Sequence, residues 1–172
     1  VTSEGAIHVF DGVTKQWLRD AIFFEDAGDA GDTYDFSPPA QQTVVTTRDR
    51  QSRASTITRV EASALVSRLR LHHRMLLPIS LTPDRQRRES RRRRVAIDVH
   101  LQLVAGSSTL EIDIAVDNTV DDHRLRLGVN VPMRADAIHC AAPFQVIERP
   151  LRLSDGKQWQ QPPAPTQPFQ DW

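Results

Sequence analysis

The amino-acid sequence predicts an all-β protein built as an antiparallel β-sandwich. Apolar and polar residues alternate with a period of two in several stretches, and turn-forming residues separate those stretches. No window of about eleven residues has a convincing helical period, and the sequence has no internal repeat. With 172 residues the chain is long enough to bury a hydrophobic core. Consecutive alternating strands on short turns predict a meander with one buried face.

The first strands are expected before residue 50. Residues 6–10 alternate, Asp11 and Gly12 form a tight-turn dipeptide, and Trp17 and Leu18 lie on the returning strand. Residues 22–24 then lead into an acidic loop, and the β-branched run at 43–47 leaves it. The acidic loop is therefore expected to join two strands.

Two further strands are predicted at residues 55–60 and 63–77. The second has one apolar face and one basic face, as its alternation indicates. The apolar face comprises Leu65, Leu69, Leu71, Met75 and Leu77, with Ser67 and His73 among them. The basic face comprises Arg68, Arg70, His72 and Arg74. The basic face therefore meets either water or the acidic surface of another domain.

The later strands are expected at residues 95–103, 110–116 and 125–131, followed by β pattern at 138–144 and 146–147. The inward residues are Val95, Ile97, Val99, Leu101, Leu103, Leu110, Ile112, Ile114, Val116, Leu125, Leu127, Val129 and Val131. The Pro-rich tail cannot pair as a central strand, since proline has no backbone N–H. We therefore predict a β-sandwich domain over residues 1–157 and an extended C-terminal arm over residues 158–172.

Composition narrows the possible partners and the compartment. Lys and Arg total 22, as do Asp and Glu, so no nucleic acid or anionic membrane is expected as a partner. The single cysteine, Cys140, excludes an intrachain disulfide and is expected to be a small core residue. A cytoplasmic location is expected, because the chain fits a reducing compartment and its first residues lack an export signal. No apolar run approaches the roughly 18 residues that span a bilayer.

Residues 23–39, FFEDAGDAGDTYDFSPP, are the strongest candidate for a site. Five carboxylates lie within eleven residues here, with glycines between them and two prolines at the end. Such a loop is unstable unless water, cations, arginines or hydroxyl-rich ligands take up the carboxylate lone pairs. It is therefore either a binding loop or an acidic solvated connection.

Two charged patterns admit other interpretations. Aspartates recur every third residue at 26, 29, 32 and 35, which is not the spacing of an EF-hand calcium loop. Residues 85–94, RQRRESRRRR, hold seven arginines without aromatic residues, so a nucleic-acid surface is disfavoured. We expect residues 85–94 to form a solvated hairpin tip, with contact to an acidic neighbouring domain as the alternative.

Three separated motifs carry a resemblance to a known family. GDAGDTYDFSPP at 28–39, VDNTVDDHRLRLGVNVP at 116–132 and PFQVIERP at 143–150 occur in the same order. They resemble the β-rich C-terminal part of glycoside hydrolase family 38, the α-mannosidases, and most of all its bacterial mannosylglycerate hydrolase branch. The resemblance implies a supersandwich-like fold that is part of a larger β domain.

The resemblance also implies that catalysis belongs to another domain of the same polypeptide. The parent reaction is a retaining, zinc-dependent hydrolysis of α-mannosides by an N-terminal catalytic domain of the same polypeptide, which this sequence does not contain. The His-x-Asp pair expected among the zinc ligands is absent, because no histidine is followed two residues later by aspartate. We therefore expect no catalytic residue, metal ligand or cofactor in this chain, which should be inactive when isolated. The mannoside cleaved and the oligomeric state are left open.

The residues expected to bind substrate come from two of the motifs. In the resembling family the tyrosine of the first motif contacts the sugar, which corresponds to Tyr34. Asp32 and Asp35 flank it and could orient it or accept from sugar hydroxyls. His123 and Arg124 could clamp an anionic or hydroxyl-rich group, or could instead neutralise neighbouring acidic residues.

A free-standing carbohydrate-binding module is the alternative function. Such modules present an exposed row of aromatic residues for stacking against sugars. Aromatic residues make up 6% of the chain, and Trp17, Trp159 and Trp172 are far apart in the sequence. Composition therefore favours the mannosidase-domain interpretation over the module.

Overall fold

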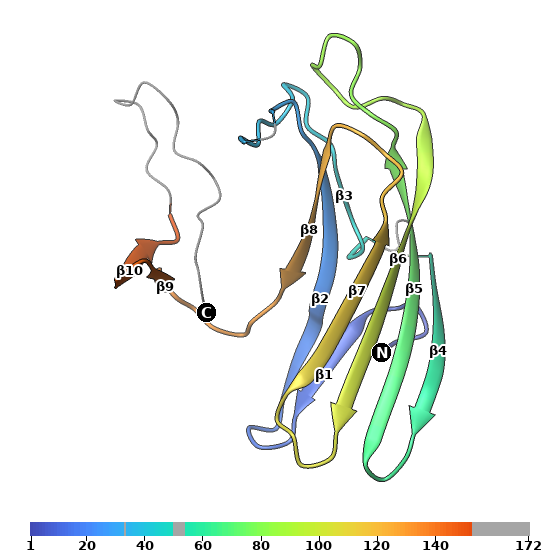
Figure 1. Cartoon of the computed structure of the whole chain (residues 1–172), viewed down its shortest axis with the longest axis vertical. Coiled ribbons are helices and arrows are strands. Elements are labelled where there is room, and N and C mark those ends of the chain that lie inside the picture. Colours follow the sequence, from blue (N-terminus) through green and yellow to red (C-terminus); the bar gives the residue numbers. More distant parts are fainter. Residues whose placement is uncertain (33, 50–53, 153–172) are drawn as a thin grey trace. The chain divides into compact units, whose positions relative to one another are not determined.

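The computed structural model describes residues 1–32, 34–49 and 54–152, and within them it contains ten strands and no helix. The strands are β1 (Ile7–Asp11), β2 (Gln16–Gly28), β3 (Val44–Thr46), β4 (Ala54–Ala62), β5 (Val66–Pro78), β6 (Arg92–Val104), β7 (Leu110–Asp117), β8 (His123–Val129), β9 (Ala137–Ala142) and β10 (Gln145–Pro150) (Figure 1). The chain divides into two compact units, Val1–Val131 and Pro132–Trp172. The predicted all-β, antiparallel fold is confirmed.

The first sheet is organised around β2. Strands β1 and β3 pair with the two halves of one edge of β2, and β8 pairs with the other edge, all antiparallel. Ile22 lies opposite Ile7 of β1 on one edge of β2 and opposite Val129 of β8 on the other edge. The pairing of β8 with β2 places residues 121–124, DDHR, next to the end of β2, where the acidic loop begins.

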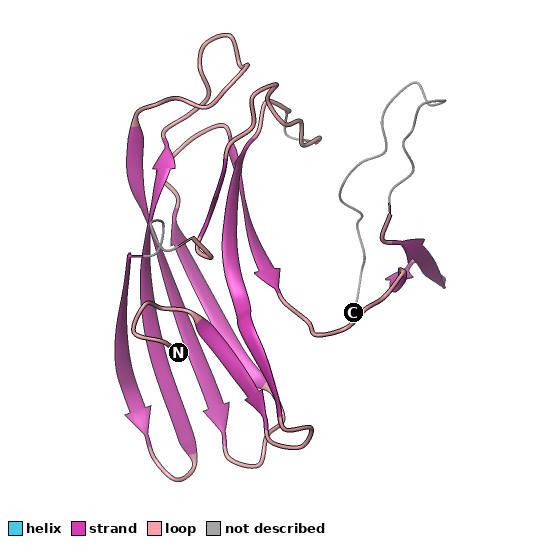
Figure 2. Ribbon diagram, turned by 180° about the vertical axis from the view of Figure 1, so that it is seen from behind, coloured by secondary structure: helices cyan, strands magenta, loops and turns pink. Residues whose placement is uncertain are grey.

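The second sheet is a meander of β4, β5, β6 and β7, each antiparallel to the next (Figure 2). Apolar side chains from this sheet and from the first form one core. Its buried members are Ile7, Ala21, Ile22, Phe24, Val45, Leu71, Met75, Leu77, Val95, Ile97, Val99, Leu101 and Val120. The first unit is therefore a sandwich, since alternate residues of two sheets meet in a shared interior.

The alternation expected for residues 63–77 is confirmed from Leu69 onward. Leu71, His73, Met75 and Leu77 are buried, and the intervening residues are partly or fully exposed. Leu65 was wrongly expected to face the core, because it lies in the turn before β5 and is 72% exposed.

The inward assignments near the sheet edges are also corrected. Leu103, Leu127 and Val129 are about half exposed, and Val131 lies beyond the end of β8 and is exposed too. Strand β8 is an edge strand of its sheet, and Leu103 lies at the open end of β6. Alternation alone does not show that the facing sheet ends before these positions.

The second unit contains the hairpin of β9 and β10, paired from Ala142 and Gln145 to Ala137 and Pro150. Cys140 is buried, as expected for a small core residue. The predicted Pro-rich arm at 158–172 lies outside the described residues. Among the described residues no helix is long and apolar enough to cross a membrane. The cytoplasmic location stays a prediction.

The structure moves the boundary of the acidic loop. Strand β2 continues to Gly28, so Glu25 and Asp26 are strand residues and not loop residues. Glu25 forms an ion pair with Arg126 on β8, whereas Asp26 is fully buried. The carboxylates of residues 23–39 are thus divided between the sandwich and the loop.

The arginine run at 85–94 was wrongly expected to be solvated throughout. Arg92, Arg93 and Arg94 begin β6, and Arg88 is buried. The remaining arginines of the run are exposed. Composition could not single out Arg88, because its burial depends on a carboxylate that lies far away in the sequence.

Candidate functional site

The acidic loop after β2 is braced by its own first aspartate. Asp29 Oδ1 accepts hydrogen bonds from the backbone N–H of Gly31 at 2.9 Å and of Ser37 at 3.0 Å. The Ala30 N–H donates to the Ser37 carbonyl at 2.7 Å. These bonds close residues 29–37 into a folded loop, because they join its two sides.

Tyr34 projects from the tip of this loop. Asp32 Oδ1 accepts from the N–H of Tyr34 at 2.8 Å and of Asp35 at 3.0 Å. These two bonds, the one from Tyr34 first, hold the pKa of the Asp32 carboxyl below its usual value. Tyr34 is 92% exposed, so its ring does not pack beneath the loop. The structure thus brings Asp32, Tyr34 and Asp35 together at one exposed point.

Arg124 lies beside the same loop. It pairs in register with Ala27 on β2, and its guanidinium stands over the Phe36 ring at 3.4 Å from the ring centroid. Burial lowers the pKa of the Arg124 guanidinium, and nearby Arg126 adds to this effect. Arg124 therefore supports the loop from below through a cation–π contact.

Asp122 connects the loop to the hairpin at residues 79–91. Its carboxylate accepts from Ser80 Oγ at 2.6 Å and from Arg85 Nη1 at 3.2 Å, and its carbonyl accepts from the Asp29 N–H at 2.9 Å. The hydrogen bond from Ser80 is the main reason why the pKa of Asp122 is lowered. Arg85 also donates to the Gly31 carbonyl at 3.4 Å. The arginine hairpin thus lies against the acidic loop.

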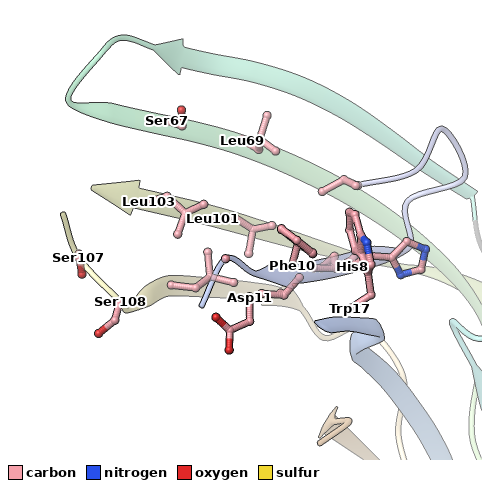
Figure 3. Close-up of a pocket in the computed structure, with 15 residues that line it drawn as sticks. His8, Phe10, Asp11, Trp17, Ser67, Leu69, Leu101, Leu103, Ser107 and Ser108 are labelled. Carbon is pink, nitrogen blue, oxygen red and sulfur yellow. The ribbon is translucent and has the colours of Figure 1, made fainter. Parts of the chain in front are cut away.

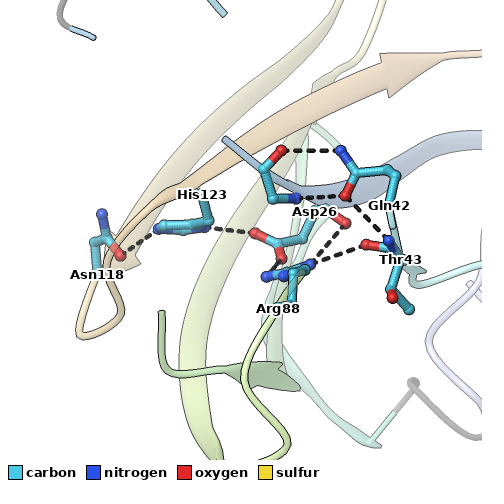
Figure 4. Close-up of polar contacts among 7 residues, drawn as sticks. Asp26, Gln42, Thr43, Arg88, Asn118 and His123 are labelled. Atoms are coloured by element: carbon cyan, nitrogen blue, oxygen red, sulfur yellow. Dashed lines mark hydrogen bonds and ion pairs between the residues drawn. The ribbon is translucent and has the colours of Figure 1, made fainter. Parts of the chain in front are cut away.

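Below the loop is a buried ionic network (Figure 4). Asp26 forms an ion pair with Arg88 through Oδ1 and lies against His123 Nδ1 through Oδ2. Because an ionised carboxylate only accepts, His123 must donate from Nδ1. His123 Nε2 is 2.9 Å from Asn118 Oδ1, so both ring nitrogens are engaged within the protein.

Asp26, Arg88 and Gln42 were not singled out from the sequence. A signal was present for Asp26, since it continues the inward alternation of Ile22 and Phe24. No comparable signal marked Arg88 or Gln42. Each acts through contacts with residues far away in the sequence.

The described residues do not assemble a set of metal ligands. No group of three or more His, Cys, Asp or Glu side chains gathers anywhere in the described part of the chain. Asp26, one of the regularly spaced aspartates, is inside the sandwich and paired with Arg88. Neither the calcium alternative nor a zinc site is therefore supported by the described residues.

A second candidate lies at the opposite end of the sandwich, near the turn between β1 and β2. A pocket of about 540 Å³ opens there between the two sheets, with leucines of β5, β6 and β7 as its floor. Phe10 and Trp17 lie side by side at this pocket, with ring centroids 5.0 Å apart, and both are about half exposed (Figure 3). The wide sequence spacing of the tryptophans gave no sign that Trp17 would pair with Phe10.

Comparison with known proteins assigns the chain to a family. Residues 4–172 match the glycosyl hydrolases family 38 C-terminal domain. A protein of Halalkalibacterium halodurans, provisionally named as a mannosylglycerate hydrolase, is 24% identical over 172 residues, covering 92% of this chain and 19% of that protein.

Solved structures share the fold. An α-mannosidase from Enterococcus faecalis V583 matches 90% of this chain and 19% of its own, with a TM-score of 0.81 and 22% identity. A glycosyl hydrolase family 38 protein from Enterococcus faecalis gives a TM-score of 0.78 at 21% identity over 87% of this chain, again with 19% of its own length. The chain spans only about a fifth of these relatives. It belongs to glycosyl hydrolase family 38, in which it corresponds to the C-terminal domain.

Proposed function

We propose that this chain is the non-catalytic β-sandwich part of a retaining, zinc-dependent α-mannosidase. It supplies the Tyr34 loop as one wall of a sugar site whose remainder, with the zinc ion and the catalytic carboxylates, belongs to an N-terminal catalytic domain. The parent reaction is hydrolysis of an α-mannosidic bond, with mannosylglycerate or its 6-phosphate as candidate substrates. The family match and the names of the relatives support this substrate class.

The exposure of Tyr34 carries the proposal. A tyrosine that is 92% exposed, on a loop held in shape by its own aspartates, presents a phenol hydroxyl and an apolar ring outward. Those two features suit a sugar, which offers hydroxyls and an apolar ring face. Asp32 and Asp35 lie on either side of Tyr34 in the sequence, and in this proposal their carboxylates accept from sugar hydroxyls.

His123 and Arg124 take supporting positions in this proposal. Arg124 holds Phe36 from beneath, and His123 joins the loop end of β8 to Asp26. Through these contacts they fix the substrate-facing side of the loop. A direct contact of Arg124 with an anionic substituent of the mannoside is the second role that we propose for it.

Kinetics of a full-length family 38 enzyme that carries this domain test the proposal. Replacing Tyr34 by Phe removes one hydrogen bond and should lower kcat/KM about 2- to 10-fold, with a larger loss for Tyr34→Ala. Val13→Ala, at a similarly exposed position at the opposite end, serves as the control. Equal kcat/KM values for the three variants would refute the role of Tyr34. Turnover of an aryl α-mannoside by the isolated 172 residues would refute the non-catalytic assignment.

The aromatic pair at the second pocket supports one alternative, a carbohydrate-binding module. Phe10 and Trp17 offer half-exposed ring faces beside the pocket, as sugar-stacking residues do. Calorimetry of the isolated chain with mannose and mannosylglycerate separates the two functions. A binding module binds alone and loses the ligand in Trp17→Ala, whereas an incomplete mannosidase site binds neither sugar measurably.

A further inference from the structure

The side chain of Arg88 differs in burial from the rest of its run. It is 2% exposed, whereas the other six arginines between residues 85 and 94 are exposed. A guanidinium keeps its charge in any folded protein, so its burial requires acceptors that surround it. These acceptors lie at the base of the acidic loop (Figure 4).

Arg88 contacts the chain on both sides of that loop. On the incoming side it pairs with the Asp26 carboxylate and donates to the Asp26 carbonyl at 3.4 Å. On the outgoing side it donates to the Thr43 carbonyl at 3.2 Å. One planar fork therefore ties together the two ends of a segment of more than a dozen residues, which a single ammonium group could not do in the same way.

Three nearby residues complete this clamp. Gln42 accepts from the Gly28 N–H at 3.0 Å and donates to the Gly28 carbonyl at 2.9 Å, which joins the same two ends just beyond the last pair of the β2–β3 ladder, Ala27 with Val44. Gly28 leaves room for Arg88, because a Cβ there would lie 2.9 Å from Arg88 Cγ. His123 satisfies the second oxygen of Asp26, so the buried carboxylate is bonded on both sides.

We propose that Arg88 is a positioning residue for the Tyr34 loop, acting by clamping the two ends of the loop at Asp26 and Thr43. The clamp itself rests on the ion pair and the hydrogen bonds of Arg88. Its consequence for catalysis rests on the proposed function, in which Tyr34 contacts the sugar. Arg88 touches neither the loop tip nor any place where substrate is expected, so its effect reaches Tyr34 through the loop ends.

Amide hydrogen exchange of the 172-residue chain tests the clamp. Arg88→Lys keeps a charge for Asp26 but loses the fork, so the N–H groups of Gly28 and Thr43 should exchange at least about tenfold faster, as local opening becomes easier. Amides at the centre of β5 and β6 should exchange as in the wild type. Arg91→Met, which replaces an exposed arginine of the same run, should leave both sets unchanged.

A second variant guards against general destabilisation. Asp26→Leu with Arg88→Met replaces the buried pair by apolar groups, an exchange that often preserves stability. We expect a folded sandwich whose loop ends still exchange faster, because the link to Thr43 is gone. Unchanged exchange at Gly28 and Thr43 in Arg88→Lys would overturn the inference, as would the same acceleration in Arg91→Met.

The chain offers one further readout at the loop tip. Tyr34 is its single tyrosine, so 3-fluorotyrosine labels that position alone. The fluorine relaxation of Tyr34 should report faster motion in Arg88→Lys and no change in Arg91→Met. In a full-length enzyme, Arg88→Lys should raise KM several-fold with little change in kcat, as loss of uniform binding does. A loosened loop with unaltered KM would refute the sugar contact of Tyr34 and leave the clamp intact.

Discussion

At Gly31 the chain passes so close to itself that a side chain has no room. A Cβ at this position would lie 1.8 Å from the Asp35 carbonyl oxygen and 2.9 Å from the Ser37 nitrogen. Both neighbours are backbone atoms of the same loop, so they cannot move aside without opening it. The absence of a side chain at Gly31 is therefore a condition for presenting Tyr34.

Gly31→Ala should consequently lower the free energy of unfolding by about 1–3 kcal/mol, the usual range for strain at a constrained backbone position. Denaturant titration measures this change. Gly12→Ala is the matched control, since a Cβ at Gly12 meets nothing within 4 Å. If both variants unfolded at the same denaturant concentration, the close approach at Gly31 would not be present in solution.

At the scale of elements, Asp122 fastens three segments at the loop end of the sandwich. Its carboxylate holds Ser80 and Arg85 of the hairpin, and its carbonyl holds the start of the acidic loop. Asp122 has φ of 49°, a left-handed conformation that Asp and Asn tolerate better than most residues. An aspartate therefore fits position 122, because it tolerates this backbone conformation and its carboxylate bonds to the hairpin.

The lowered pKa of Asp122 predicts a particular pH dependence. The folded protein keeps the Asp122 carboxyl ionised at pH values somewhat below 3.8, the usual pKa of an aspartate. The resulting stabilisation is therefore fully present above pH 3.8 and is lost as the pH falls through the pKa of the folded state. Asp122→Asn should therefore flatten the decline of stability as the pH falls below the usual carboxyl value of 3.8. Urea unfolding at several pH values measures the slope. An unaltered slope in Asp122→Asn would contradict the assignment.

For the whole molecule, the stability of the first unit depends on where the two sheets face one another. Leu71 on β5 is fully buried in the shared core, whereas Leu127 on edge strand β8 is about half exposed. Leu71→Ala leaves a cavity that the close-packed surroundings cannot fill.

We therefore expect Leu71→Ala to lower the free energy of unfolding by about 2–5 kcal/mol, and Leu127→Ala by about 1 kcal/mol or less. Thermal or urea unfolding of the two variants measures the difference. Because both substitutions remove the same atoms, the difference reports how deeply each leucine is buried. Comparable losses would mean that β8 is covered in solution by a further element.

Much of this architecture could be predicted from the sequence, since alternation with a period of two depends only on local order. The strands at 6–10, 95–103 and 110–116 and the buried face from Leu69 to Leu77 followed from that pattern, and the motifs at 28–39 and 116–132 indicated the family. The register between β2 and β8, which places Gly28 opposite His123, could not be predicted, because it joins segments about a hundred residues apart.

The sequence by itself determined the fold class, the family and a loop that carries Tyr34 among carboxylates, because each depends on local patterns of residue types. Only the tertiary structure decided which charges are buried. Asp26 looked like one more loop carboxylate and Arg88 like one more solvated arginine, yet the two meet inside the sandwich. A charged side chain is buried only where a partner of opposite charge and further hydrogen bonds are present. Only folding brings together partners from segments that are distant in the sequence.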